Sequence, residues 1–348
     1  MKRATIGDVA TRAGVSKATV SHVINATRFV EQMTKQRVLN AIEELGYRPS
    51  MVARSLTTNQ TNTVGVLVSD TSNNFYAEIL LGIESALRPA GYGLIVCNTA
   101  ETRELELGAL DLLLSQRVDG LLVAGATRYW DPLNRAEAEQ LPIVFVDREF
   151  EGLTGPFVGI DNELAAYAGT RCLIEAGHED LGLVVGQTPA SAMRGRVAGF
   201  RRAAQECGLT IREDWIMYCQ SQVDAACEAV ERLFVLPNHP TALLVTNNVM
   251  MLGVLRGFKT LGLRCPEDVS LVGFDDNPWW DVTSPPLTAV LQPSRHLGRK
   301  AGELLLAIMR GEEPATRRIV LPCELVERDS VAPPATVRRK QGQATGIG

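Results

Sequence analysis

Residues 5–25 carry the pattern of two short amphipathic helices joined by a tight turn. Thr5 and, three residues later, Asp8 form a capping box that fixes where the first helix begins. Gly14 ends this helix, and Ser16 is a suitable N-cap for the second. One apolar face follows from the helical spacing of Ile6, Val9, Ala10 and Ala13. The segment therefore predicts a helix-turn-helix, the arrangement that places a helix in the major groove of DNA.

The second predicted helix has an apolar face formed by Val20, Val23 and Ile24. Its other face is suited to DNA, since Lys17 and His22 can donate to guanine and Ala18 can contact a thymine methyl. Thr19 and Ser21 can hold phosphate oxygens. The candidate DNA-binding residues of this segment are Thr5, Ser16, Lys17, Ala18, Thr19, Ser21, His22, Asn25 and Arg28. The alternative is a small helical cap that contacts no nucleic acid.

A third helix is expected from about Thr34 to Leu45, with Val38, Ile42 and Leu45 facing inward and Gly46 ending it. Charge supports a nucleic-acid partner for this region. Residues 1–60 contain nine Lys or Arg and four acidic residues, whereas the whole chain has a net charge of −5. The head thus carries +5 and the remaining body −10, which suits a basic DNA-binding head on an acidic body.

Beyond residue 62, short apolar runs alternate with helical stretches, which predicts parallel sheets covered on both faces. The boundary near residues 159–161 divides these runs between two doubly wound α/β subdomains, with a ligand cleft at the carboxyl ends of the strands. The predicted strands contain residues 64–68, 94–97, 121–123, 143–146, 183–185, 243–245 and 271–274.

Polar and aromatic side chains follow these strands where core packing does not require them. Carboxylates, amides and arginines can pair with hydroxyls that both donate and accept, and aromatic faces can cover the C–H surface of a sugar ring. Arg196, on a helix beside the expected cleft, is a further candidate. The predicted effector contacts are Asn73, Phe75, Tyr76, Asp147, Arg148, Arg196, Asn247, Phe274, Asp275 and Gln292, and Asp70 follows the first strand as well.

Other features exclude several classes of protein. The seven cysteines are scattered and without a close pair, so we expect reduced, mostly buried thiols. Four widely spaced histidines give little support for a metal site. No apolar run has the length of a membrane span and no signal segment is found, which predicts a cytoplasmic protein without a membrane partner. We find no phosphate-binding glycine loop and no nucleophile elbow, and therefore predict no cofactor and no catalytic residues.

Residues 48–62 join head and body. Pro49 keeps the third helix from continuing beyond Gly46, a short helical stretch capped by Ser50 follows, and a polar linker completes the segment. Seven residues are too few for a stable isolated helix. At this point the chain resembles the lactose repressor/galactose repressor family of bacterial transcription regulators, in particular its ribose and purine repressors, over nearly its whole length. The resemblance implies a hinge helix that folds only on operator DNA, where the paired hinge helices of a dimer enter the minor groove and Leu56 wedges between base pairs. Ser50, Ala53 and Arg54 complete the DNA-binding residues of this segment: Ser50 caps the helix, Ala53 lets the two helices approach, and Arg54 lies near phosphate. A passive tether is the alternative.

The same resemblance implies a body with the periplasmic sugar-binding-protein fold and ligand contacts at the positions named above. The chain departs from the family pattern in having Ala124 and Gly125 after the third strand, no second stacking aromatic near residues 219–222, and Asn247–Asn248 in place of an Asn–Asp pair. These departures leave room for a pentose, a hexose, or a sugar acid held by Arg148 and Arg196. The Trp279–Trp280 pair is expected to pack in the core rather than close over a ligand.

The expected division of the chain is a head at 1–47, a hinge and linker at 48–62, an effector-binding and dimerisation body at 63–332, and a disordered tail at 333–348. Within the body, one subdomain comprises about 63–160 and 293–320, the other about 161–292 and 321–332. A dimer is expected because one recognition helix contacts too few bases. Leu and Met on the helices around residues 75–87 and 250–258 are candidates for its interface. A tetramerising coiled coil is not supported, because the tail lacks heptads.

The leading hypothesis is a homodimeric repressor whose affinity for operator DNA changes when a sugar or sugar acid binds between the subdomains. A regulator that needs a purine co-repressor is the alternative, and the sign of the ligand effect stays open. An enzyme on the same scaffold and an exported solute-binding protein are the other classes. The missing catalytic motifs speak against the enzyme, and the DNA-binding head speaks against the solute-binding protein.

Overall fold

A computed structural model of the chain describes residues 4–25, 28–47, 60–125, 140–149, 155–187 and 191–334. The chain divides into two compact units, Met1–Thr61 and Asn62–Gly348, which are treated separately. The predicted hinge residues Ser50, Ala53, Arg54 and Leu56 lie outside the described residues, as does most of the tail predicted at 333–348.

The first unit contains the three predicted helices, α1 (Ile6–Ala13), α2 (Lys17–Asn25) and α3 (Gln32–Glu44). The capping box is confirmed, because the Thr5 hydroxyl accepts from the backbone N–H of Asp8 and the Asp8 carboxylate accepts from the backbone N–H of Thr5 at 2.8 Å. Gly14 ends α1 at φ +64°, a left-handed conformation suited to glycine. Ser16 caps α2 through a 3.1 Å bond from the N–H of Thr19 to its hydroxyl oxygen.

The core of this unit contains fully buried Val9, Val20 and Val38. The prediction that Leu45 faces inward is wrong, since its side chain is 37% exposed. The reason is that α3 begins and ends earlier than expected, so Leu45 lies just beyond the last helical residue. Ala41 is the buried residue of the last turns, and Ile42 is partly buried against the same cluster.

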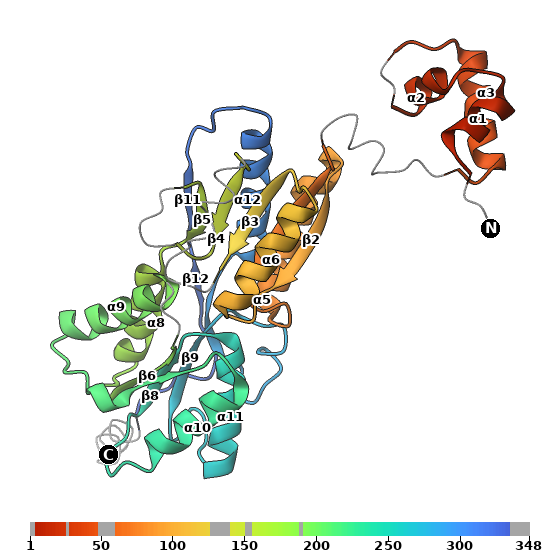
Figure 1. The fold of residues 1–348 in the computed structure, drawn as a ribbon. Helices are drawn as coiled ribbons and strands as arrows, with labels where there is room; N and C mark the ends of the chain where they lie inside the picture. The colour runs from red at the N-terminus through yellow and green to blue at the C-terminus, as the bar shows by residue number, and fades with distance from the viewer. Residues whose placement is uncertain are drawn as a thin grey trace, which may run out of the picture. The chain divides into compact units, whose positions relative to one another are not determined.

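The second unit is built on two six-stranded sheets (Figure 1). The first has the order β11-β5-β4-β3-β1-β2 and is parallel throughout. Its strands are β1 (Thr63–Val68), β2 (Gly93–Asn98), β3 (Gly120–Ala124), β4 (Ile143–Val146), β5 (Phe157–Ile160) and β11 (Arg318–Leu321).

The second sheet has the order β12-β10-β9-β8-β6-β7, and only the β10–β12 pair is antiparallel. Its strands are β6 (Leu181–Gly186), β7 (Ile216–Cys219), β8 (Ala242–Val245), β9 (Ser270–Phe274), β10 (Thr288–Leu291) and β12 (Glu324–Val326). The predicted α/β class with a helix-turn-helix head and two doubly wound sheets is confirmed. The seven predicted strands are all found, while β5, β7, β10, β11 and β12 were not predicted.

Helices cover both sheets and pack on each other in pairs: α5 with α12, α8 with α9, and α10 with α11. Glycines permit these close approaches, since a Cβ at Gly298 would lie 2.0 Å from the carbonyl oxygen of Ile79, and one at Gly253 would lie 2.3 Å from that of Val223. The helical elements are α5 (Asn74–Leu87), α6 (Arg103–Ser115), α8 (Asn162–Glu175), α9 (Ser191–Glu206), α10 (Val223–Phe234), α11 (Asn248–Leu261) and α12 (Ser294–Met309), with short 3-10 turns at η1 (Arg88–Ala90) and η2 (Glu213–Trp215).

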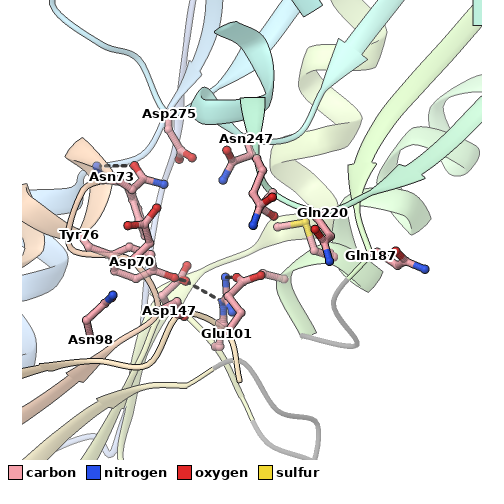
Figure 2. Close-up of a pocket in the computed structure, with 18 of the residues that line it drawn as sticks. Asp70, Asn73, Tyr76, Asn98, Glu101, Asp147, Gln187, Gln220, Asn247 and Asp275 are labelled. Carbon is pink, nitrogen blue, oxygen red and sulfur yellow. Dashed lines mark hydrogen bonds and ion pairs between the residues drawn. The ribbon is translucent and has the colours of Figure 1, made fainter. Parts of the chain in front are cut away.

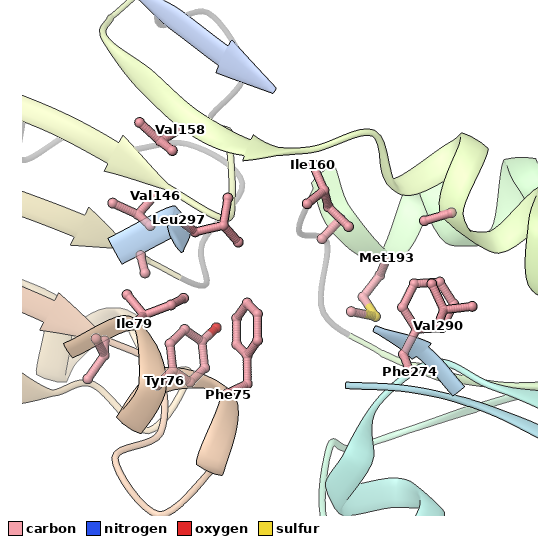
Figure 3. Packing of buried hydrophobic residues seen from close by; sticks show 14 of the residues in the cluster. Phe75, Tyr76, Ile79, Val146, Val158, Ile160, Met193, Phe274, Val290 and Leu297 are labelled. Carbon is pink, nitrogen blue, oxygen red and sulfur yellow. The ribbon is translucent and has the colours of Figure 1, made fainter. Parts of the chain in front are cut away.

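One hydrophobic cluster includes buried residues of both sheets. Figure 3 shows it as two groups, with Phe75, Tyr76 and Leu297 in the first and Met193 and Phe274 in the second. The side chains that bear on the cleft therefore rest directly on the cores of the two subdomains. This support holds the cleft walls in fixed positions.

Three smaller expectations have mixed outcomes. Trp280 is fully buried in the second sheet's core, as predicted, whereas Trp279 is 36% exposed. Met250 and Met251 are also fully buried in the second sheet's core, so these two methionines of α11 are not available to the predicted dimer interface. All seven cysteines are free, but only Cys219 is buried and the other six are half-buried, so the prediction that the thiols are mostly buried is wrong.

No helix of the described ranges has both the length and the apolar character needed to cross a bilayer.

Candidate functional site

A cavity of about 490 Å³ lies between the two subdomains, at the carboxyl ends of strands from both sheets. Figure 2 shows side chains of the first subdomain, among them Asn73, Tyr76 and Asp147, on one side and Asn247 and Gln220 of the second on the other. Its described lining is Ser69, Asp70, Asn73, Phe75, Tyr76, Asn98, Ala100, Glu101, Thr102, Asp147, Arg148, Gln187, Ala192, Met193, Arg196, Gln220, Ser221, Gln222, Asn247, Asp275 and Gln292.

Asp147 and Arg148 follow β4 directly and form the charged centre of the first wall. Asp147 is buried with φ +67°, a left-handed conformation that turns the chain sharply at the strand end. Its carboxylate accepts a 3.3 Å bond from the hydroxyl of Tyr76 and lies 3.4 Å from Nε of Arg148. The Nη2 of Arg148 also donates to Glu101 at 2.8 Å. Burial raises the pKa of Tyr76 well above its ordinary value, so this hydroxyl stays protonated as a donor.

Arg148 keeps its charge although it is buried. Burial by itself lowers its pKa, but the neighbouring Tyr76, Glu101 and Asp147 raise it, and the net shift is upward. Its guanidinium is thus a permanent cation between acidic groups. Within the described residues, Nη1 of Arg148 and Oδ1 of Asp147 have no hydrogen-bond partner, so each has capacity left for a ligand.

Asp275 has the equivalent place in the second sheet, directly after β9. It is buried and has φ +63°, close to the value at Asp147. Its carboxylate accepts from the amide nitrogen of Gln292 and is near Arg196. Burial raises the pKa of Asp275, and the charge of Asp147 adds to this, while Arg196 and Gln292 oppose it; the net shift is upward. Two carboxylates, one from each subdomain, therefore act on one another across the cavity.

Arg196 is a buried residue of α9 that belongs to the wall of the second subdomain. Its Nε donates to Asn162 at 2.8 Å, and its Nη1 donates to the carbonyl oxygen of Thr246. The guanidinium carbon lies 4.2 Å from the ring centroid of Phe274. Phe274 itself is fully buried and does not line the cavity, which corrects its predicted place among the ligand contacts. The physical reason is that Arg196 covers the ring.

Two asparagines cap the helices that face each other across the cleft. The side-chain oxygen of Asn73 accepts from the N–H of Phe75 at the start of α5, and that of Asn247 accepts from Val249 and Met250 at the start of α11. The amide nitrogen of Asn248 donates to the oxygen of Asn73 at 2.8 Å. This bond joins the two subdomains, and it uses the residue at which the chain departs from the family's Asn–Asp pair.

Of the ten predicted effector contacts, all but Phe274 line the cavity. Whether each one contacts a ligand stays a prediction. Five polar residues that line the cavity were not among the predicted effector contacts: Asn98, Glu101, Gln187, Gln220 and Gln222. Asn98 and Gln187 end or follow β2 and β6, so the rule that found the other residues could have found them. Gln220 follows β7, a four-residue edge strand that was not predicted although its residues are apolar, so the same rule applies to Gln220 once this strand is known.

Most of the predicted DNA-binding residues of the head lie on α2 or cap it, while Thr5 caps α1 and Arg28 follows α2. Thr5, Ser16, Lys17, Ala18, Asn25 and Arg28 are exposed, whereas Thr19, Ser21 and His22 are half-buried. Hydrogen bonds organise part of this face, since the Ser16 and Thr19 hydroxyls are 2.9 Å apart and Asn25 donates to Ser21 at 3.3 Å. Lys17 and Ala18 in the first turn of α2 are thus available to a groove.

Comparison with known proteins agrees with both parts of this description. Residues 5–50 match the model for bacterial regulatory proteins of the lacI family, and residues 170–331 match that for a periplasmic binding protein-like domain. The HTH-type transcriptional repressors PurR of Vibrio cholerae and of Aliivibrio salmonicida are 38% and 40% identical to the chain, over 94% of it and 98% and 99% of their own lengths. The chain belongs to the lacI family.

Solved structures of this family superpose on the chain as well. The lac repressor dimer bound to operator and the anti-inducer ONPF has a TM-score of 0.86 at 28% identity, covering 95% of this chain and all of that one. A putative ribose operon repressor from Burkholderia thailandensis has a TM-score of 0.70 at 34% identity, covering 76% and 98%. The chain is therefore a DNA-binding transcriptional repressor of the lacI family, with operator DNA and a small-molecule effector as its partners.

Proposed function

We propose that the effector of this lacI-family repressor is a sugar or a sugar acid, and that its binding in the cavity changes the affinity for operator DNA. The observation that carries this proposal is the alternation of donors and acceptors on both walls, with Asp147 and Arg148 facing Asp275 and Asn247. A sugar hydroxyl donates to one group while it accepts from another, so such a mixed set is suited to a ring with several hydroxyls.

The second candidate effector is a purine, and the observation that favours it is the 38–40% identity to repressors named PurR. The distribution of aromatic residues favours the sugar. Among the described lining residues, Phe75 and Tyr76 are the aromatic ones, and both come from α5 in the first subdomain. The facing wall contributes Gln220, Ser221 and Gln222, which offer hydrogen bonds rather than a stacking surface for a flat base.

We further propose the division of labour expected from the sequence, with the head at 1–47 contacting DNA and the body at 63–332 binding the effector as a cytoplasmic homodimer. Exposed Leu81 on α5 and Leu252 on α11 support an interface on these helices. A dimer is also the state of the solved lac repressor that superposes on the chain. The proposed role is regulatory rather than enzymatic, in keeping with relatives that are named as transcriptional repressors.

Calorimetric titration of the full chain with neutral aldoses, sugar acids and purine bases tests the effector proposal. We expect a sugar or sugar acid to bind, and Asp147→Asn to weaken its binding at least about tenfold, because a buried charge-assisted hydrogen bond is lost. Asp224→Asn is the matched control, since Asp224 is exposed and pairs with Arg256 outside the cavity. Binding of a purine alone, or equal loss in both variants, would overturn the proposal.

A further inference from the structure

The charges that line the cavity distinguish between neutral sugars and sugar acids as ligands. Its described lining contains four carboxylates, Asp70, Glu101, Asp147 and Asp275, and two guanidinium groups, Arg148 and Arg196. The excess of two formal negative charges opposes an anionic ligand. We infer that the site selects neutral polyhydroxylated ligands and rejects sugars that carry a carboxylate or a phosphate. This inference rests on the proposed function and narrows it.

Arg148 cannot bind an acidic ligand without disturbing its present ion pairs. Its guanidinium already pairs with Glu101 at 2.8 Å and lies 3.4 Å from the Asp147 carboxylate. The side chains of Arg148 and Asp147 are 8% and 5% exposed, so water screens this group little. A ligand carboxylate at Arg148 would be the third acidic group around one cation. Either it would meet two nearby negative charges, or it would displace one and leave a buried carboxylate unpaired.

Arg196 is engaged in a different way. Two of its nitrogens donate to Asn162 and to the carbonyl oxygen of Thr246, and its flat face lies on the ring of Phe274. These contacts fix its plane and leave little freedom to turn toward a new partner. Asp275 is close enough for the charge of Arg196 to lower its pKa, so an anion at Arg196 would also approach Asp275. The second cation therefore offers no isolated anion site.

The unsatisfied atoms point to a group that can both donate and accept. Within the described residues, the buried atoms without a hydrogen-bond partner include two oxygens of lining residues, Oδ1 of Asp147 and Oε1 of Gln292, and two nitrogens of Arg148, Nε and Nη1. The oxygens need a donor from the ligand, and the nitrogens need an acceptor. A hydroxyl can serve both, whereas a carboxylate or a phosphate dianion can only accept and so serves the nitrogens alone. Because Asp147 and Asp275 belong to different subdomains, a neutral donor between them also reduces their mutual repulsion.

The test uses matched sets that share one carbon skeleton: ribose, ribonate and ribose 5-phosphate; glucose, gluconate and glucose 6-phosphate; and galactose, galactonate and galactose 6-phosphate. Each compound is titrated calorimetrically into the full chain. We expect at least one neutral sugar to bind and its acid and phosphate to bind at least about tenfold more weakly, because a like charge enters a buried acidic site. An acid or phosphate that binds as tightly as its neutral parent overturns the inference and leaves the proposed function standing. Binding by none of the nine compounds counts against both.

Two variants test the cause of the selectivity. Glu101→Gln removes one of the acidic partners of Arg148 and should narrow the ratio between the neutral and the anionic dissociation constants at least about threefold. Glu213→Gln is the control, because Glu213 forms an exposed pair with Arg201 away from the cavity and should leave the ratio unchanged. A ratio that does not move in Glu101→Gln contradicts the role given to the acidic groups around Arg148.

Discussion

At the residue scale, Asp147 and Asp275 are the pair on which the site depends. Both follow a strand, both have a positive φ, and both line the cavity, Asp147 from the first subdomain and Asp275 from the second. For residues other than glycine this conformation costs free energy, and such costs gather at functional sites. Keeping a carboxylate buried adds to that cost. We therefore expect part of the stability of the protein to be given up for ligand binding.

Asp275→Asn tests this trade-off. Since burial raises the pKa of Asp275, the folded state holds its proton more tightly than the unfolded state, and the resulting stabilisation is lost as the pH rises through the folded pKa. The Asn variant carries no charge to bury. At pH 7 we expect it to melt at least about 2 °C higher than the parent, and the difference should shrink toward pH 4. Thermal melting across this range measures it.

The control for this prediction is Asp224→Asn, which changes an exposed carboxylate. It should leave the melting temperature within about 1 °C at either pH. A variant Asp275→Asn that melts lower than the parent at pH 7, or a difference that does not change with pH, would contradict the electrostatic account of this residue.

Single residues were predicted best where a simple rule applied. Polar side chains directly after apolar strands, such as Asp147 and Asn247, line the cavity because the carboxyl ends of parallel strands share one edge. Glu101 was not found, since it lies three residues after β2 and enters the cavity through the following turn. Phe274 was wrongly included because chain position does not show that Arg196 covers its ring.

At the element scale, pairs of helices support the walls of the cleft. In the α10–α11 pair, Gly253 lets α11 approach so closely that a Cβ would lie 2.3 Å from the carbonyl oxygen of Val223. Because α11 begins with the cavity residue Asn247 as its cap, this packing also positions the site. The requirement is steric, since backbone atoms cannot move away as a flexible side chain can.

Gly253→Ala should therefore destabilise the body by about 1–3 kcal/mol, the range typical of overpacking. Gly108 provides the comparison, because it is also helical but has no atom within 4 Å of an added Cβ. Gly108→Ala should be neutral or stabilise by up to about 1 kcal/mol, as alanine favours a helix. Urea denaturation of both variants gives the two values. Equal effects would show that the close approach does not matter.

The hinge is the second element with a testable role, although it lies outside the described residues. From the family resemblance, Leu56 is expected to wedge between base pairs in the minor groove. Leu56→Ala should weaken binding to the specific operator more than binding to random DNA, because the wedge acts only on the deformed site. Salt-matched titrations of both duplexes measure the two losses, and equal losses would remove the wedge from the account.

Most strands with a clear apolar run were predictable, whereas five strands of three or four residues, two of them internal to the sheets, were not. The core strands β1, β3 and β8 are continuous apolar runs and were all found. The edge strands β7 and β11 have four residues each with exposed positions among them, and β12 has three residues, so each is too short to give a clear strand pattern although most of its residues are apolar. Their pairing is decided by neighbouring strands far along the chain, such as β11 with β5, which no local pattern contains.

At the scale of the whole molecule, the body is two subdomains with a cavity between them and hydrogen bonds from one to the other. Among them are the bond from Asn248 to Asn73 and the bond from the backbone of Glu149 to Ser191. A ligand that contacts both walls adds to these bonds and thereby shifts the balance between open and closed arrangements. Such a shift changes DNA binding only if the hinge and head respond to it. A coupling of about 1–3 kcal/mol would change operator affinity roughly 5- to 150-fold.

The central claim is that the ligand in the cavity and the operator affect each other's binding. The most direct measurement is fluorescence anisotropy of an operator duplex, selected in vitro with the full chain, titrated with the protein with and without the saturating sugar found by calorimetry. We predict a change in operator affinity of at least about fivefold that Asp147→Asn abolishes at the same sugar concentration while its operator binding without sugar is retained. An unchanged operator affinity at full occupancy of the cavity would contradict the account.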